Sequence, residues 1–134
     1  MIDHVSLAVR DLSKAEPFYV ALLAPLGMRK LREWPNAAVG FGKKYPEFWI
    51  NRRGAMARVA DDSGVHICLR ATDVRAVEDF HTAALKAGGT SDGAPGLRTE
   101  YHASYYAAFI RDPDGNRIEA VTFLRDADSS PPRE

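Results

Sequence analysis

Two histidines at matching positions of an internal repeat are the residues of this sequence best suited to bind a metal ion. Sliding residues 1–50 onto the second half by 62 positions superposes His4 on His66. Copies of one supersecondary unit bring equivalent residues into equivalent places, and imidazole is a common ligand of divalent transition metals. The same offset aligns further pairs: Asp11 with Asp73, Phe18 with Phe80, Leu23 with Leu85 and Gly27 with Gly89.

Glu119 supplies a carboxylate for the same site. It lies in the strand-like run 117–123, where alternation places it among apolar neighbours. Burying an unpaired charge is costly, so the carboxylate needs a partner. Arg70 or Arg117 would serve in a purely structural role, and a strand histidine is often a hydrogen-bonded structural residue. Two imidazoles and one carboxylate, however, suit a divalent transition metal with positions left open for substrate or water.

The first half predicts a βαβββ module that would position His4. Residues 2–9 alternate as a strand, and Asp11 is typical of a helix N-cap. Apolar residues then recur at helical spacing until Gly27, where the helix should stop. Three short strands follow, at 28–34, 37–42 and 47–51.

The second half repeats this order after a polar linker at 52–63, whose centre, 56–60, could form a short strand. We expect a strand at 64–70, a helix from Asp73 to about Ala87 and a turn at Gly88 and Gly89. An irregular stretch follows at 90–100, and then come strands at 104–111 and 116–124. Because this stretch makes the second module's loop the longer one, we expect residues 90–103 to gate the cleft.

These patterns predict an α+β fold of two paired βαβββ modules that form a cup-shaped mixed sheet with helices on its outer face. By length the chain is one domain. We place it at residues 1–124, with modules at about 1–51 and 64–124, and interpret residues 125–134 as a flexible tail.

Composition excludes several functional classes. The 18 lysines and arginines equal the 18 aspartates and glutamates, so the basic footprint of a nucleic-acid-binding protein is missing. No apolar run approaches the roughly 20 residues of a membrane span. The one cysteine, Cys68, cannot form an internal disulfide, which fits a reducing compartment. We therefore expect a cytoplasmic protein that acts on a small-molecule substrate.

The sequence resembles the vicinal oxygen chelate superfamily, which includes glyoxalase I, bleomycin-resistance proteins, extradiol dioxygenases and fosfomycin-resistance thiol transferases. The resemblance covers about residues 1–124. It is carried by residues 3–12, Phe18-Tyr19, 65–67 and, most specifically, the Asp-Pro-Asp-Gly-Asn-x-x-Glu motif at 112–119. It implies a divalent metal ion, Fe, Mn, Ni, Co or Zn, held at the positions of His4, His66 and Glu119.

Departures from the family leave the reaction class open. The fourth ligand of glyoxalase I aligns with Trp49, and the tyrosine common in extradiol dioxygenases aligns with Phe109. Fosfomycin thiol transferases have a threonine at the position of Ser6, and their phosphonate- and potassium-binding loop does not match residues 99–107. Bleomycin-binding members usually lack the ligands. Lyase or isomerase, thiol transferase and dioxygenase chemistry all remain open.

Around the expected cleft we assign a catalytic role in proton transfer to His102 and Tyr105, because imidazole and phenol can exchange protons with a metal-bound oxyanion. Two further residues are expected to have no catalytic role. We interpret Cys68 as a quiet buried thiol and His81 as solvent-facing. We expect substrate binding by the remaining cleft residues: Ser6, Trp49, Arg98 and Tyr101.

Two functional classes compete. The first is a small metal-dependent enzyme that chelates vicinal oxygens of its substrate, and the second is a metal-free protein that sequesters an aromatic or cationic ligand between Trp34, Trp49 and the tyrosines. We also expect a homodimer. If the modules pair by exchange between two chains, His4 would come from one chain and His66 with Glu119 from the other.

Overall fold

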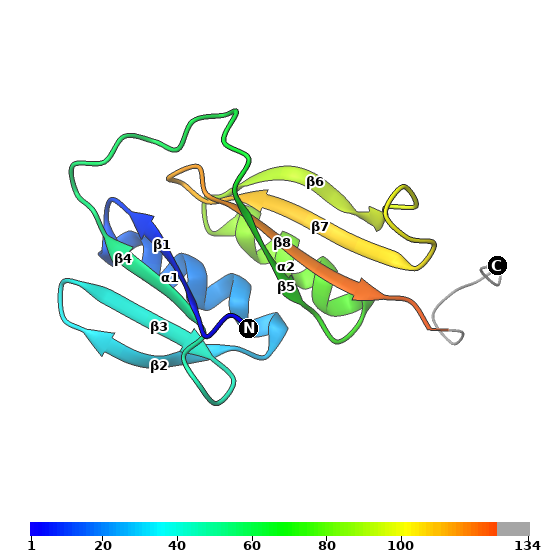
Figure 1. The fold of residues 1–134 in the computed structure, drawn as a ribbon, viewed down its shortest axis with the longest axis horizontal. Coiled ribbons are helices and arrows are strands. Elements are labelled where there is room, and N and C mark those ends of the chain that lie inside the picture. The colour runs from blue at the N-terminus through cyan, green and yellow to red at the C-terminus, as the bar shows by residue number, and fades with distance from the viewer. Residues whose placement is uncertain (126–134) are drawn as a thin grey trace.

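Two βαβββ modules lie side by side in the computed structural model, which describes residues 1–125 (Figure 1). The predicted tail at 125–134 falls almost entirely outside the described residues. The first module contains β1 (Val5–Val9), α1 (Leu12–Leu23), the 3-10 turn η1 (Ala24–Leu26), β2 (Arg29–Trp34), β3 (Ala38–Gly42) and β4 (Phe48–Arg52). The second contains β5 (His66–Arg70), α2 (Val74–Lys86), β6 (Thr90–Leu97), β7 (Tyr105–Arg111) and β8 (Arg117–Phe123).

Each module builds its own mixed sheet, with the same topology in both. The strand orders are β1-β4-β3-β2 and β5-β8-β7-β6, and the first strand of each module is parallel to the last. The predicted α+β class and the two βαβββ modules are therefore confirmed. No strand pairing joins the two sheets within residues 1–125. The edge strands β1 and β5 consequently lie unpaired on the sides by which the modules face each other (Figure 1).

The registers show which positions of the two modules are equivalent. Ser6 of β1 pairs with Trp49 of β4, and Cys68 of β5 pairs with Glu119 of β8. Since Ser6 and Cys68 match by the repeat offset, Trp49 occupies in the first module the place that Glu119 occupies in the second.

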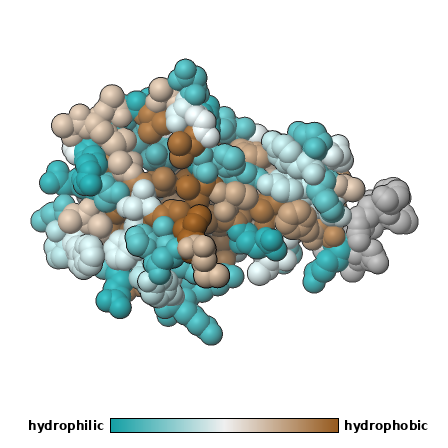
Figure 2. Space-filling view, viewed as in Figure 1, coloured by the Kyte–Doolittle hydropathy of each residue, from teal (hydrophilic) through white to brown (hydrophobic). Residues whose placement is uncertain are grey.

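Aspartate caps start both helices, and the helices share one core. The Asp11 carboxylate accepts hydrogen bonds from the backbone N–H groups of Ser13 and Lys14, and that of Asp73 accepts one from Ala76. The helices pack against each other, and both contribute fully buried aromatic and aliphatic side chains to a single cluster. Apolar side chains also gather along the middle of the face shown in Figure 2.

Buried polar contacts tie the second module's last turn to the first module. The Tyr19 hydroxyl donates to the Asp112 carboxylate at 2.5 Å, and both groups are buried. The Asn116 amide donates to the Ala8 carbonyl at 2.9 Å, and the Arg10 guanidinium pairs with Asp114 at 2.6 Å. The motif at 112–119 thus holds the modules together as well as carrying Glu119.

The expectation of an irregular stretch at 90–100 was wrong, because residues 90–97 form β6. The strand pairs with β7 through two register shifts around Gly93, and bulges of this kind accommodate the glycines and proline that indicate a loop. The loop between β6 and β7 therefore comprises only residues 98–104. The longer loop at 90–103, predicted to gate the cleft, is not present, because most of its residues belong to β6. No strand forms at 56–60.

The prediction that His81 faces solvent was also wrong. Its side chain is buried under β6, where Nε2 lies 2.8 Å from the Ser91 hydroxyl oxygen. Helical periodicity places His81 beside Phe80 but does not indicate that β6 covers the side of α2 on which His81 lies.

Among the described residues, no helix is long and apolar enough to cross a membrane.

Candidate metal centre

His66 and Glu119 form the closest pair of possible metal ligands on the second sheet. Nε2 of His66 lies 3.0 Å from Oε1 of Glu119. The parallel β5–β8 register explains this contact, since His66 pairs with Arg117 and Cys68 with Glu119, which puts both ligands on one face. The Glu119 side chain is 3% exposed and that of His66 is 47% exposed. The pair thus joins a buried carboxylate to an accessible imidazole.

The Tyr105 hydroxyl holds the second oxygen of this carboxylate. It donates to Oε2 of Glu119 at 2.5 Å from the neighbouring strand β7. Burial, reinforced by this hydrogen bond, raises the pKa of Tyr105 well above its ordinary value. The phenol therefore stays protonated at neutral pH and acts as a hydrogen-bond donor to Glu119.

Cys68 lies beside this pair but is exposed, so the interpretation of a buried thiol was wrong. As part of the edge strand β5, Cys68 has no neighbouring strand on one side to cover it. Its Sγ lies 3.9 Å from the Tyr105 hydroxyl. Partial burial of the sulfur and the Glu119 carboxylate raise the pKa of the thiol to about 12, which keeps it protonated and unreactive at neutral pH.

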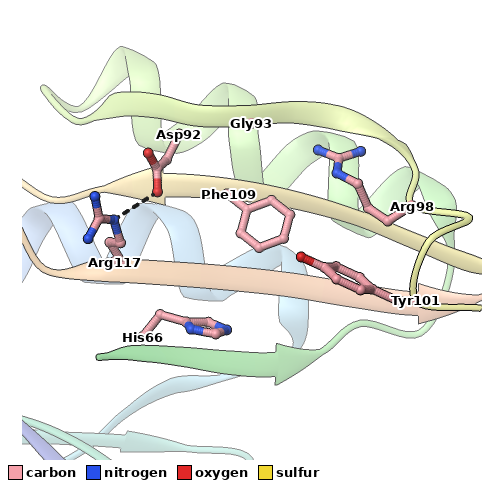
Figure 3. Close-up of a pocket in the computed structure, with 7 residues that line it drawn as sticks. All are labelled: His66, Asp92, Gly93, Arg98, Tyr101, Phe109 and Arg117. Atoms are coloured by element: carbon pink, nitrogen blue, oxygen red, sulfur yellow. Dashed lines mark hydrogen bonds and ion pairs between the residues drawn. The ribbon is translucent and has the colours of Figure 1, made fainter. Parts of the chain in front are cut away.

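A pocket of about 380 Å³ opens next to His66. Figure 3 shows how its walls are arranged: Phe109 forms the floor on β7, and Tyr101 enters from the loop after β6. The Phe109 ring centroid lies 6.5 Å from that of His66 and 5.2 Å from Cζ of Arg98. Two of the predicted substrate-binding residues, Arg98 and Tyr101, therefore do line the pocket beside His66.

The sequence did not indicate the opposite wall of this pocket. Arg117 pairs with Asp92 at 3.1 Å (Figure 3), and its other nitrogens donate to the linker carbonyls of Ser63 and Asp61. Asp92 falls in the stretch that the local sequence indicates as irregular, so the sequence does not predict its position on a strand. Recognising residues 90–97 as a strand would have placed it opposite β7, close to the cleft.

His4 lies in the first module, in a second pocket of about 370 Å³. Its Nδ1 lies 2.7 Å from the Asp3 carboxylate, and both side chains are more than half exposed. No group of three or more histidine, cysteine or acidic side chains within residues 1–125 is placed to hold a metal ion. His4 of the same chain thus does not join His66 and Glu119.

The remaining residues of this second pocket include predicted substrate ligands. Trp49 packs against Trp34, with ring centroids 5.4 Å apart and the ring planes tilted by 36°, and its indole N–H donates to the Pro46 carbonyl. The Ser6 hydroxyl accepts a hydrogen bond from the Asn51 amide at 2.7 Å. Ser6 and Trp49 are therefore grouped with His4, and Arg98 and Tyr101 with His66.

His102 lies on the loop at 98–104 but not in the wall of either pocket. Its Nδ1 accepts the Ser104 backbone N–H at 3.0 Å, and its ring packs edge-on against Phe123. These contacts fix the loop that carries Tyr101.

Comparisons with known proteins agree with this arrangement. A family model described as the Glyoxalase/Bleomycin resistance protein/Dioxygenase superfamily matches residues 1–120. A glyoxalase/bleomycin resistance protein from Albidiferax ferrireducens T118 superposes with a TM-score of 0.76 at 30% identity, covering 90% of this chain and 97% of that chain.

Two more distant solved structures share the fold. A lactoylglutathione lyase from Agrobacterium tumefaciens has a TM-score of 0.61 at 22% identity and covers 90% of this chain and 92% of its own. The fosfomycin resistance protein FosX from Mesorhizobium loti has a TM-score of 0.66 at 17% identity and covers 92% of each chain. A search of proteins with curated functions finds no match.

Proposed function

This chain belongs to the Glyoxalase/Bleomycin resistance protein/Dioxygenase superfamily, and we propose that it is a small divalent-metal-dependent enzyme that chelates vicinal oxygens of a small substrate. The observation that carries the proposal is the contact of His66 with Glu119 at the edge of an open pocket. Whether the reaction is a lyase or isomerase, thiol-transfer or dioxygenase reaction stays open. A cytoplasmic location stays a prediction.

The donor set fits such an ion in chemical type. His66 offers an imidazole nitrogen and Glu119 a carboxylate oxygen, both ligands of Fe, Mn, Ni, Co and Zn. The Tyr105 hydrogen bond orients the carboxylate, as outer partners of metal ligands commonly do. Within residues 1–125, one chain brings no third ligand to this pair, so we propose that the third ligand, His4, comes from a second chain.

A homodimer with exchanged modules would bring the ligands together. His4 directly precedes β1 and His66 begins β5, and within residues 1–125 each of these strands is a sheet edge with no pairing strand on one side. His4 and His66 match by the repeat offset of 62 residues, so a twofold pairing of β1 with β5 of another copy would place the two imidazoles at equivalent positions. Trp49 would then face the site from the position equivalent to that of Glu119.

Residues around the proposed ion would line the pocket, orient Glu119 and exchange protons with the substrate. When bound, the ion supplies Lewis-acid stabilisation of negative charge on the substrate oxygens. Phe109 and Tyr101 line one side of the pocket and offer aromatic surfaces to a substrate. Tyr105 fixes Glu119 through its protonated hydroxyl, and we propose that His102 exchanges protons through Nε2, which makes no hydrogen bond to the described residues.

Metal analysis of purified variants tests the ligand set. We expect His66→Ala and Glu119→Ala to lose stoichiometric metal and to retain the wild-type circular dichroism spectrum, because the sheet forms without the ion. Glu78→Ala, which removes an exposed carboxylate from α2, is the matched control and should keep its metal. Unchanged metal content in both ligand variants would exclude this set.

A mixed dimer tests the exchange of modules. We expect differently tagged His4→Ala and His66→Ala chains, purified as a heterodimer, to bind one ion per dimer, because one of the two sites then keeps both histidines. Each variant alone should bind none. A heterodimer without metal would contradict exchange, and a monomer in sedimentation at micromolar concentration would contradict the dimer itself.

The contact between Trp34 and Trp49 favours a second candidate, a metal-free protein that sequesters an aromatic or cationic ligand. The rings lie 5.4 Å apart in the pocket that also contains Tyr45, and such surfaces bind flat or cationic molecules. Absence of metal from the wild-type protein, together with quenching of its tryptophan fluorescence by an aromatic cation, would favour this function over the enzyme.

A further inference from the structure

We propose that the substrate of the pocket beside His66 is a flat organic anion, with a carboxylate or phosphonate group bound at Arg98 and an aromatic or conjugated body lying against Phe109. This names the substrate class of the site described above, and its link to catalysis rests on the proposed function. The charges, the free hydrogen-bond donors and the shape of the pocket favour an anion site that does not depend on a metal ion.

The two arginines of the pocket differ in how far their charges are satisfied. Arg117 has its Nε on the Asp92 carboxylate at 3.1 Å and both terminal nitrogens on backbone carbonyls. Arg98 makes no ion pair with any carboxylate of residues 1–125. The positive charge of Arg98 is therefore the one that a bound anion would balance.

Backbone carbonyls hold the Arg98 guanidinium in place and leave several of its N–H groups free to bind a ligand. Its terminal nitrogens donate to the Gly96 carbonyl at 2.9 Å and the Ala94 carbonyl at 2.6 Å. A guanidinium carries five N–H groups, so most remain available. Fixing the planar fork on the backbone in advance reduces the entropy lost when it binds a carboxylate or phosphonate in a bidentate manner.

The aromatic walls select the shape of the ligand. The Phe109 ring lies between His66 and Arg98, 6.5 Å from one and 5.2 Å from the other. Figure 3 shows the Tyr101 hydroxyl pointing into the pocket between Phe109 and His66. A flat body on Phe109 would thus direct one end to the ligand pair and the other to Arg98, with Tyr101 over its edge.

Gly93, at the register shifts of β6, leaves room for the side chains of Phe109 and Arg98. A Cβ at position 93 would lie 2.9 Å from the Phe109 ring and 3.1 Å from the Arg98 guanidinium. The backbone there has φ +158°. The bulged strand therefore leaves space for Phe109 and Arg98 to lie next to each other, which a regular strand with a side chain at this position would not.

Titration of chelator-treated protein with benzoate and its neutral isostere benzamide, followed by NMR chemical shifts, tests the anion site without metal. We expect benzoate to bind about tenfold more tightly than benzamide, consistent with one charge-assisted bidentate pair. The shifts should map to residues 98–109, and added NaCl should weaken benzoate alone. Phenylphosphonate in place of benzoate distinguishes the two anionic groups.

Variants assign the preference to one residue. Arg98→Gln should remove the difference between benzoate and benzamide, whereas Arg75→Gln, which changes an exposed arginine on α2, should retain it. Arg98→Lys preserves the charge if the glutamine variant fails to fold, and should retain a reduced preference. Equal binding of benzoate and benzamide to wild type, no benzoate binding, or an undiminished preference in Arg98→Gln would overturn the proposal.

The tests of the anion site and of the metal site can fail independently of each other. An anion preference in a protein that binds no metal through His66 and Glu119 would leave this inference standing and remove the metalloenzyme. Stoichiometric metal with no anion preference would do the reverse.

Discussion

The Tyr105 hydroxyl lies 2.5 Å from Oε2 of Glu119, and Oε1 of the same carboxylate lies 3.0 Å from His66. One buried carboxylate is thereby held from two neighbouring strands. The Tyr105 hydroxyl keeps donating to this oxygen at neutral pH, because burial and the hydrogen bond to Glu119 raise the pKa of the phenol well above its ordinary value. His66 lines the open pocket, and under the proposed function its contact with Glu119 would be replaced by contacts of both side chains with the ion.

Replacing Tyr105 by phenylalanine should weaken this arrangement in two measurable ways. Loss of this hydroxyl donor to a buried carboxylate should lower the free energy of unfolding of the metal-free protein by about 1–3 kcal/mol. Metal affinity should fall roughly 10–100-fold, as for other partners of metal ligands. Urea denaturation and metal titration measure the two effects.

Tyr106→Phe is the matched control for this substitution. Its hydroxyl donates to the exposed Glu78 on α2, so its loss should cost less than about 0.5 kcal/mol and leave metal binding unchanged. Equal effects of the two substitutions on metal affinity would show that Tyr105 does not support the site through Glu119.

The Tyr19–Asp112 hydrogen bond should contribute strongly to stability, because it joins the modules inside the core. Tyr19→Phe leaves the buried carboxylate with one donor fewer and should cost about 1–3 kcal/mol in urea denaturation. Tyr45→Phe removes a hydrogen bond of similar type to the exposed Asp3 and should be nearly neutral. A Tyr19→Phe variant as stable as the Tyr45→Phe variant would contradict this role.

Much of this fold follows from local sequence signals. The caps at Asp11 and Asp73 and the turn after Leu26 are short-range patterns, and the predicted helices match α1 and α2 to within a few residues. The repeat offset placed His4 and His66 at equivalent positions because duplicated modules keep their strand register. The alignment of Trp49 with Glu119 agrees with the same registers.

What the sequence left out depends on contacts between distant strands. The proline and glycines of β6 indicate a loop locally, and only pairing with β7 through bulges makes this segment a strand. His81 is buried because β6 covers it, and Cys68 is exposed because β5 is an edge. The ion pair of Asp92 with Arg117 likewise needed the position of β6. Short-range periodicity carries no information about these neighbours.

Stability should fall on acidification because His81 is buried. Desolvation lowers the pKa of its imidazole below the ordinary value of 6.5, so the unfolded chain binds a proton that the folded chain resists. This contribution is fully present above the unfolded pKa and is lost as the pH falls from 6.5 through the folded pKa. His81→Gln should show a smaller loss of unfolding free energy than wild type between pH 7 and about pH 5, measured by urea denaturation. Parallel pH curves for the two proteins would contradict the burial of a neutral histidine.

Gly40 on β3 leaves room for the contact between Trp34 and Trp49 in the second pocket, the one that contains His4. A Cβ at this position would lie 2.8 Å from the Trp49 indole, which is closer than carbon atoms approach, so Gly40→Ala must push the indole away from its contact with Trp34. Overpacking of this kind costs about 1–3 kcal/mol. The chain has two tryptophans, both in this pair, and the tryptophan fluorescence emission spectrum therefore reports on it directly.

We expect Gly40→Ala to shift the tryptophan emission to longer wavelength and to lower the midpoint of urea denaturation. Gly64→Ala, at a position with no atom within 4 Å of the added carbon, should change neither. An unshifted spectrum in a stable Gly40→Ala protein would mean that Trp49 does not lie flat against β3.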